Sequence, residues 1–104
     1  MKVIFSIIFA MWSTSVFAGK LNELNFITES YPPYNYQENG KLMGMSVDIL
    51  EAATKAAGDP VMRKDVKLQP WARGYASALS GPKVALFATT RTAERESKFK
   101  WVGP

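Results

Sequence analysis

The sequence contains no cysteine and no histidine. The lack of cysteine excludes a disulfide framework, thiolate catalysis, a zinc site built on thiolates and the lipid anchor of a bacterial lipoprotein. The carboxylates of Glu29, Asp48, Glu94 and Glu96 show no pairing that suggests acid or base catalysis. We therefore expect no enzyme, and no catalytic residue, metal site or cofactor.

The excess of basic over acidic residues is also small. The chain carries 13 basic and 9 acidic residues, a formal net charge of +4 at pH 7. Removal of Lys2 with an N-terminal signal leaves twelve basic residues and a net charge of +3, spread along the chain rather than clustered. That balance is too weak and too scattered for nucleic acid, and we expect no nucleic-acid partner.

No apolar run is long enough to span a membrane. A positive charge at Lys2 is followed by an apolar stretch from Val3 to Trp12, which falls short of the roughly 20 residues a spanning helix needs. Val16 and Ala18 have the spacing of a signal-peptidase site. The pattern predicts a secretory signal peptide over residues 1–18, cleaved after Ala18, and disfavours an uncleaved anchor.

The mature part, Gly19 to Pro104, has 86 residues and shows no internal repeat, low-complexity segment or linker. This length suffices for one small domain, although small domains bury a smaller share of their surface. It is therefore either a complete minimal fold or a piece of a larger one.

Turn residues punctuate an alternating pattern of elements. Asn39-Gly40 predicts a hairpin turn, Ser46 is a candidate N-cap, and Gly58 ends the helix that follows. The order favours the α/β class, with a mostly parallel sheet covered by helices. The expected elements are a strand over 24–28, a hairpin over 34–45, a helix over 46–57, a strand over 61–68, a helix from Pro70 to Ser80, a strand over 83–90, a short helix from about Thr92 and an extended segment over 99–102.

Two polar, ring-rich segments follow predicted strands. In parallel sheets ligands bind beyond the carboxyl ends of the strands, which is where Tyr31 and the run from Thr89 to Arg95 are expected. Helix N-terminal amides, a threonine hydroxyl and an arginine fork all favour a carboxylate, and a tyrosine face can stack on the rest of a ligand. The combination predicts a carboxylate site with Arg91 and Arg95 as candidates.

Each of these segments also has a purely structural interpretation. The run "TTRTAERE" also fits a capped surface helix with solvated charges, since exposed charges rarely carry function. The rings of "YPPYNY" can cover a core, and so can Trp71 on its helix face. The functional interpretation depends on both segments lying at one sheet edge.

The stretches "YPPYNYQENGKLMGMSVDILEAA" and "ATTRTAERESKFKWVGP" resemble two motifs of the bacterial extracellular solute-binding proteins of family 3. The first matches the family's Tyr-x-Pro-aromatic turn, Asn-Gly hairpin and helix start, and the second its Ser/Thr-x-Thr-x-x-Arg segment. The resemblance covers residues 24–104. It implies part of lobe one of a two-lobed, periplasmic-binding-protein type II clamshell, so we expect the chain to be a fragment.

The resemblance implies roles for individual residues. Tyr31 would stack on the ligand, Trp71 would supply a second aromatic face, Thr90 would donate a hydroxyl and Arg95 would grip a carboxylate. Arg91 is a further candidate.

The "W-x-R" and "T-R-T-x-x-R" patterns place Arg73 and Arg91 either in the cleft or on its rim. Thr28 stands where receptors of basic amino acids carry an acid, which leaves the solute defined only as small, polar and carboxylate-bearing.

The function implied by the resemblance is periplasmic binding of an amino-acid-like solute. A small-molecule solute and an ABC permease of the inner membrane would be the partners, and the protein would be a monomer. The alternative is a ligand-sensing module of a larger sensor or of a cell-wall enzyme.

Overall fold

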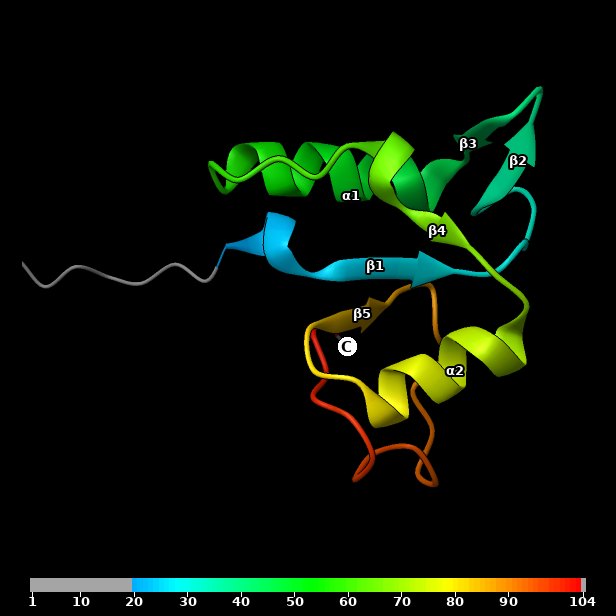
Figure 1. The fold of residues 1–104 in the computed structure, drawn as a ribbon, viewed down its shortest axis with the longest axis vertical. Coiled ribbons are helices and arrows are strands. Elements are labelled where there is room, and N and C mark those ends of the chain that lie inside the picture. The colour runs from blue at the N-terminus through cyan, green and yellow to red at the C-terminus, as the bar shows by residue number, and fades with distance from the viewer. Residues whose placement is uncertain (1–19, 104) are drawn as a thin grey trace, which may run out of the picture.

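The computed structural model describes residues 20–103 (Figure 1). The signal peptide predicted over residues 1–18 lies outside the described residues. Within them we find no helix with the length and apolar character that crossing a membrane requires. The elements in chain order are the 3-10 turn η1 (Leu21–Glu23), β1 (Asn25–Thr28), β2 (Tyr36–Glu38), β3 (Lys41–Met43), α1 (Met45–Ala56), the 3-10 turn η2 (Arg63–Asp65), β4 (Lys67–Leu68), α2 (Trp71–Ser80) and β5 (Val84–Leu86).

Strand β1 is the centre of a three-stranded parallel sheet with the order β4-β1-β5. Ile27 is opposite Lys67 of β4 on one side and Leu86 of β5 on the other. Strands β2 and β3 form a separate antiparallel hairpin. The predicted α/β class with a parallel sheet flanked by helices is confirmed.

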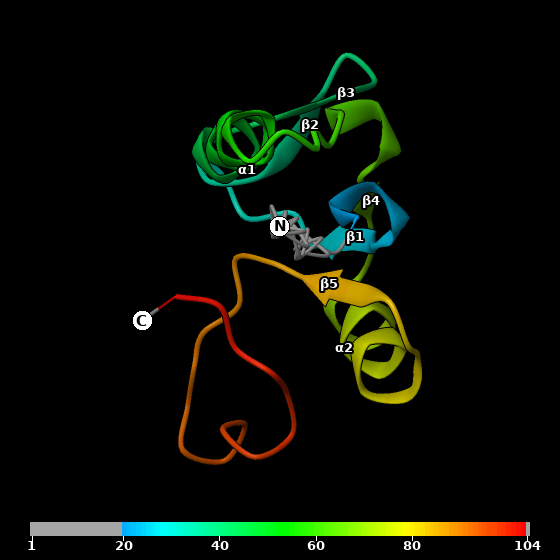
Figure 2. The same ribbon diagram turned by 90° about the vertical axis from the view of Figure 1, so that its left-hand side faces the viewer.

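The two helices cover opposite faces of β1 (Figures 1 and 2). Successive residues of a strand point to opposite faces. Phe26 joins a buried cluster with Val47 of α1. Ile27 lies against Gly74 of α2, where a Cβ would come within 3.2 Å of its Cγ2 atom. Burial of each such side chain contributes about 1.5–3 kcal/mol, so β1 holds both helical layers.

The hairpin and the start of α1 are built on backbone turns. Asn39 and Gly40 both have positive φ values, 50° and 75°, as a tight hairpin turn requires. The N-cap of α1 is Gly44, with φ 122°, so the prediction of Ser46 is wrong. The amide of Ser46 instead donates to the carbonyl oxygen of Tyr34 at 2.8 Å. The loop after β1 therefore supplies the cap that a side chain was expected to give.

The strand predicted over residues 61–68 forms only at its end, as β4. The amide of Val61 donates to Oγ1 of Thr54 at 2.9 Å, and Arg63 turns its guanidinium toward Glu51. These bonds hold the segment against α1 instead of beside β1, which is why the strand prediction fails there. Helix α2 fits its prediction closely, because Pro70 precedes Trp71 as the N-cap.

The short helix predicted from Thr92 does not form. Arg95 N donates to Thr92 O at 3.1 Å and Lys98 N to Arg95 O at 3.0 Å. These bonds span three residues, whereas an α-helix needs spans of four. The segment is a series of turns because Glu96 folds back toward Arg91.

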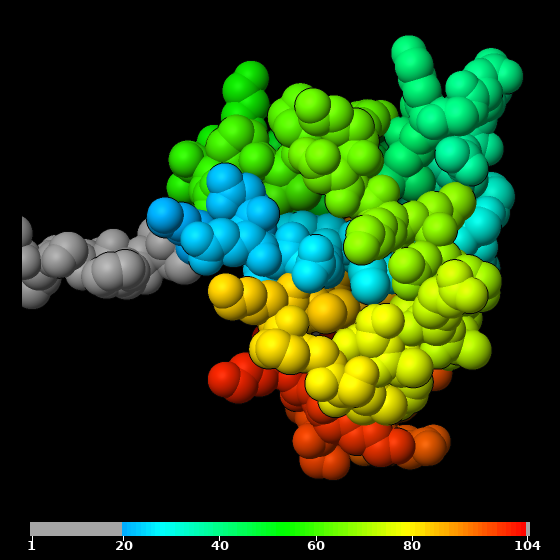
Figure 3. Space-filling model, in the orientation of Figure 1, coloured from blue at the N-terminus to red at the C-terminus, as the bar shows by residue number. Residues whose placement is uncertain are grey.

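Residues 88–103, which we call the C-terminal loop, leave the sheet at Ala88. That residue has φ 55° and turns the chain out of β5, so the strand predicted over 83–90 is shorter than expected. The extension predicted for residues 99–102 pairs with no strand of the described part. The loop lies against α2, at the end of the molecule opposite the hairpin (Figure 3).

Candidate functional site

Predicted site residues follow all three parallel strands. Tyr31 comes after β1, Trp71 after β4, and Thr90 and Arg95 after β5. Because the strands are parallel, their carboxyl ends share one edge of the sheet, which is the usual ligand position in such folds. The sheet thus brings these segments to one side of the molecule.

Arg95, Trp71 and Thr90 are in contact at this edge. The Cζ atom of Arg95 lies 4.9 Å from the ring centroid of Trp71 and 5.5 Å from that of Tyr75. Its Nη1 donates to the backbone oxygen of Thr90 at 3.2 Å. Trp71 and Tyr75 are one helical turn apart on α2, so their rings are neighbours. The ring faces attract the guanidinium.

The rings continue beyond Tyr75 into the C-terminal loop. Phe99 meets Tyr75 edge to face with centroids 5.4 Å apart, and Trp101 meets Phe99 at 5.8 Å. We call Trp71, Tyr75, Phe99 and Trp101 the aromatic row. Arg91 lies over Trp101 at 5.5 Å. An arginine therefore stands at each end of the row, and the row joins α2 to the loop.

Arg91 uses all three guanidinium nitrogens on protein oxygens. Nε and Nη2 donate to the two carboxylate oxygens of Glu96 at 2.7 and 2.5 Å, and Nη1 donates to Gly103 O at 3.0 Å. The hydrogen bond from Arg91 lowers the pKa of Glu96 and the bond to Glu96 raises the pKa of Arg91. Both side chains are exposed, so this pair is solvent-screened.

Arg63 is likewise neutralised, by Asp48 and Glu51 of α1, whose hydrogen bonds raise its pKa. Within residues 20–103, neither Arg95 nor Arg73 forms an ion pair with a carboxylate.

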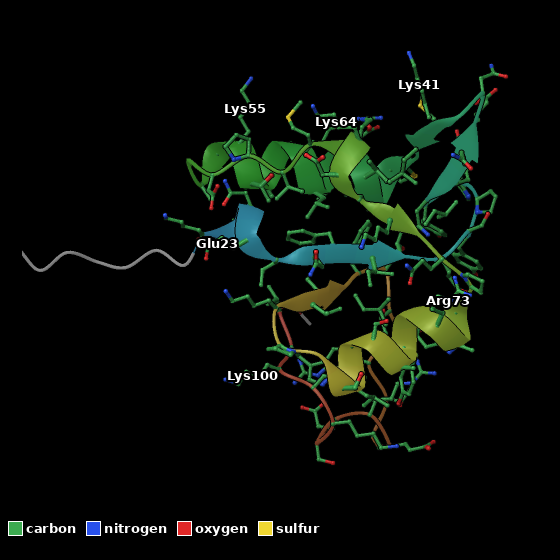
Figure 4. All side chains as sticks on the ribbon, in the orientation of Figure 1. Glu23, Lys41, Lys55, Lys64, Arg73 and Lys100 are labelled. Carbon is green, nitrogen blue, oxygen red and sulfur yellow. The ribbon has the colours of Figure 1, made fainter. Side chains whose placement is uncertain are left out.

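Arg73 is exposed near the start of α2 (Figure 4). It lies two residues from Trp71, roughly 200° around a helix, so it is on another side of α2 from the ring. Arg95 is therefore the half-buried cation at the sheet edge that no carboxylate neutralises.

Tyr31 lies apart from the aromatic row. It stacks on Tyr34 with centroids 5.5 Å apart and an interplanar angle of 12°, and it is 59% exposed. No ring contact within the described residues joins this pair to the row. The structure therefore brings Trp71 and Thr90 into contact with Arg95, whereas Tyr31 is exposed and has no ring contact with the row.

In the part of the chain that the structure describes, two open hollows differ in their relation to the edge. The smaller, about 390 Å³, lies between the segments after β1 and β4 and is lined by Glu29, Ser30, Leu68, Gln69 and Pro70. The larger, about 460 Å³, is lined by the hairpin, η2 and β4, including Lys41 and Lys64, and by no predicted site residue. Figure 4 shows those lysines on the side away from α2. Of these two hollows, the smaller is the one at the strand ends.

Thr28 has a structural role in this arrangement. It is 1% exposed, and its Oγ1 donates to the backbone oxygen of Phe87 at 3.1 Å. The bond ties β1 to the residue after β5 and so supports the base of the C-terminal loop.

Sequence reasoning missed four residues around the site. The site predicted from the sequence gives no role to Tyr75, Glu96, Phe99 or Trp101. The spacing of Trp71 and Tyr75 by four residues is a signal for adjacent rings on a helix. The contacts of Phe99 and Trp101 depend on how the C-terminal loop folds back, which no local pattern encodes. Within residues 20–103, no three acidic side chains gather in a way that could hold a metal ion.

A family model described as "Bacterial extracellular solute-binding proteins, family 3" matches residues 24–104. The match runs from β1 through the C-terminal loop and includes all five predicted site residues. No curated protein and no solved structure matches the chain.

Proposed function

Because the chain belongs to the bacterial extracellular solute-binding proteins of family 3, we propose that it binds a small polar solute bearing a carboxylate and delivers it to an ABC permease. The family is one of binding proteins, and the parallel sheet with flanking helices is consistent with part of a type II lobe. The proposal includes export to the periplasm through a signal peptide cleaved after Ala18.

The observation that carries the proposal is the state of Arg95. Its guanidinium lies on the faces of Trp71 and Tyr75 and gives one hydrogen bond, to Thr90 O. A stacked guanidinium still presents N–H groups along its edge, in the fork that matches a carboxylate. Arg63 and Arg91 have their carboxylates within the protein, whereas Arg95 has its positive charge available for a ligand.

The other proposed contacts have different chemistry. Trp71 would offer its ring beside the carboxylate, and the Thr90 hydroxyl would donate a hydrogen bond. Tyr31 is exposed at the end of β1, where its face can cover the apolar part of a solute. These contacts favour an amino-acid-like solute with one anionic end and a short body.

The first experiment is a thermal-shift screen of amino acids and small carboxylic acids on the full-length protein, which identifies the solute. Isothermal titration then compares Arg95→Ala with Lys100→Ala. Lys100 is an exposed cation of the same loop (Figure 4), so its loss changes the charge equally without touching the proposed site.

We expect Arg95→Ala to weaken binding by more than about 2 kcal/mol, because it removes one side of a charged, hydrogen-bonded pair that the bound solute would cover. This corresponds to roughly thirtyfold in affinity. Arg91→Ala should cost less. Unchanged affinity in Arg95→Ala, or equal losses in Arg95→Ala and Lys100→Ala, would show that Arg95 does not hold the carboxylate.

A further inference from the structure

The C-terminal loop is closed by side chains at its base. Arg91 near its start reaches Gly103 at its end through Nη1, at 3.0 Å. The indole Nε1 of Trp101 donates to the backbone oxygen of Glu96 at 3.2 Å, and the carboxylate of Glu96 accepts two bonds from Arg91. We call Arg91, Glu96, Trp101 and Gly103 the loop staple. Four contacts thus connect the two ends of the loop with its middle.

Regular secondary structure does not hold this loop. Its turn residues form two backbone bonds across three residues, from Arg95 to Thr92 and from Lys98 to Arg95. Such isolated turns fix a chain weakly, because each ordered residue costs about 1–2 kcal/mol of conformational entropy. The position of the loop must therefore depend on its side-chain contacts.

Arg95 lies inside the stapled segment and directly beside Glu96. The contacts of its guanidinium are one bond to Thr90 O and the faces of Trp71 and Tyr75 on α2. A change of backbone direction at residue 96 would lift the neighbouring guanidinium from these rings. The staple and the ring contacts fix Arg95 from two sides, the loop and the helix.

We infer that Arg91 and Glu96 are positioning residues that hold Arg95 in the orientation in which it receives a carboxylate. This rests on the proposed function of Arg95. A binding group whose orientation is set before the ligand arrives loses less freedom on binding. Arg91 therefore acts through Arg95, and its own charge is neutralised by Glu96.

The chain offers a closely matched pair of variants. Glu96→Gln removes the acceptor of the two bonds from Arg91. Glu94→Gln makes the same chemical change two residues away and removes only an exposed pair with Lys98, whose atoms are 3.8 Å apart. Arg91→Lys keeps the charge but loses the planar fork. All of these side chains are exposed, so the fold should persist.

The ligand-free test is an NMR spectrum of arginine Nε–H groups in the full-length protein. The Arg95 signal is assigned by its loss in Arg95→Lys. Two ring faces should displace this signal from the value of a solvated arginine. We expect Glu96→Gln and Arg91→Lys to return it toward that value, and Glu94→Gln to leave it in place. An unchanged Arg95 signal in Glu96→Gln overturns the inference.

The second arm uses sodium acetate as the carboxylate probe, with sodium chloride at equal ionic strength as reference. The Arg95 signal of the unmodified protein should move with acetate, and the apparent affinity should fall about three- to tenfold in Glu96→Gln. If acetate moves no Arg95 signal in any variant, the proposed function of Arg95 fails, while the ligand-free spectra still decide the staple. Equal acetate affinity in the unmodified protein and Glu96→Gln overturns the positioning role alone.

Discussion

Arg91 and Arg95 are four residues apart and use the same functional group differently. Arg91 donates its hydrogen bonds to Glu96 and Gly103. Arg95 instead stacks on two rings, and most of its N–H donors have no partner within the described residues. The difference arises from the neighbours that each meets, because no helix forms to place both on one face. For these two residues, the groups that surround each arginine indicate its role better than their four-residue spacing in the sequence does.

The pair of Arg91 and Glu96 should make stability depend on pH. The hydrogen bond from Arg91 lowers the pKa of Glu96 in the folded protein. Its contribution to the free energy of unfolding is therefore complete above the ordinary glutamate pKa and is lost as pH falls through the lowered value. Melting temperatures of the unmodified protein and Glu96→Gln should differ at about pH 7 and converge once the pH has fallen below the lowered pKa of Glu96.

Glu94→Gln serves again as the control, since Glu94 pairs with Lys98 and not with Arg91. A melting-temperature difference that persists unchanged into acid would contradict an ionic contribution from Glu96.

Among the elements, α1 depends on a single backbone position. Gly44 has φ 122°, and a Cβ there would collide with the backbone oxygen of Tyr34. That close approach lets the amides of Met45 and Ser46 bond to the preceding loop. The same contact fixes the loop that carries Tyr31, so the start of the helix and the proposed aromatic surface share one constraint.

Replacement of Gly44 by alanine should therefore destabilise the fold strongly. We expect Gly44→Ala to lower the free energy of unfolding by more than about 2 kcal/mol, because the backbone strain adds to a steric clash. Gly58→Ala is the matched control. Gly58 also has a positive φ, 82°, but no atom lies within 4 Å of its Cβ position, so it should lose only about 1 kcal/mol.

Urea unfolding of both variants measures the difference, with the slope of the transition checking that each unfolds in the same way. Equal losses of unfolding free energy in the two variants would show that the clash with Tyr34 O adds nothing to the cost of placing alanine at a positive φ.

Elements bounded by clear turn or capping residues could be predicted from the sequence. The Asn39-Gly40 turn and the residues that bound the two helices gave the hairpin, α1 and α2 nearly as they are. The segment before β4 was predicted as a strand but is held against α1 by the bonds of Val61 and Arg63, which its local pattern does not reveal. The helix at Thr92 failed because contacts between distant residues decided the path of the loop.

For the whole molecule, the parallel sheet is what assembles the candidate site. Strand order predicted the segments of Tyr31 and of Thr90 and Arg95 at one edge of the sheet, and they follow β1 and β5. The position of Trp71 was implied by the family resemblance and not by strand order. Tyr31 shares the edge but pairs with Tyr34 instead of the row. The contacts of Tyr75 and Glu96 required the folded loop, because they join parts of the chain that no local pattern relates.

Export is the prediction that concerns the whole chain. N-terminal sequencing of protein from the periplasmic fraction should begin at Gly19, because Val16 and Ala18 form the predicted cleavage site. A bulky residue should block processing in Ala18→Trp, while Val16→Ala should be processed normally. Protein that retains Met1 and stays in the cytoplasm would contradict the signal peptide.

The aromatic row also has an optical consequence. Of the three tryptophans in the sequence, Trp12 precedes the predicted cleavage site, and Trp71 and Trp101 are the two ends of the row. Each indole lies beneath a guanidinium, and its emission responds to the electric field of that charge. Residues 19–104 therefore carry two tryptophan fluorophores, one reporting on Arg95 and the other on Arg91, and single Trp→Phe replacements would separate their signals without any added label.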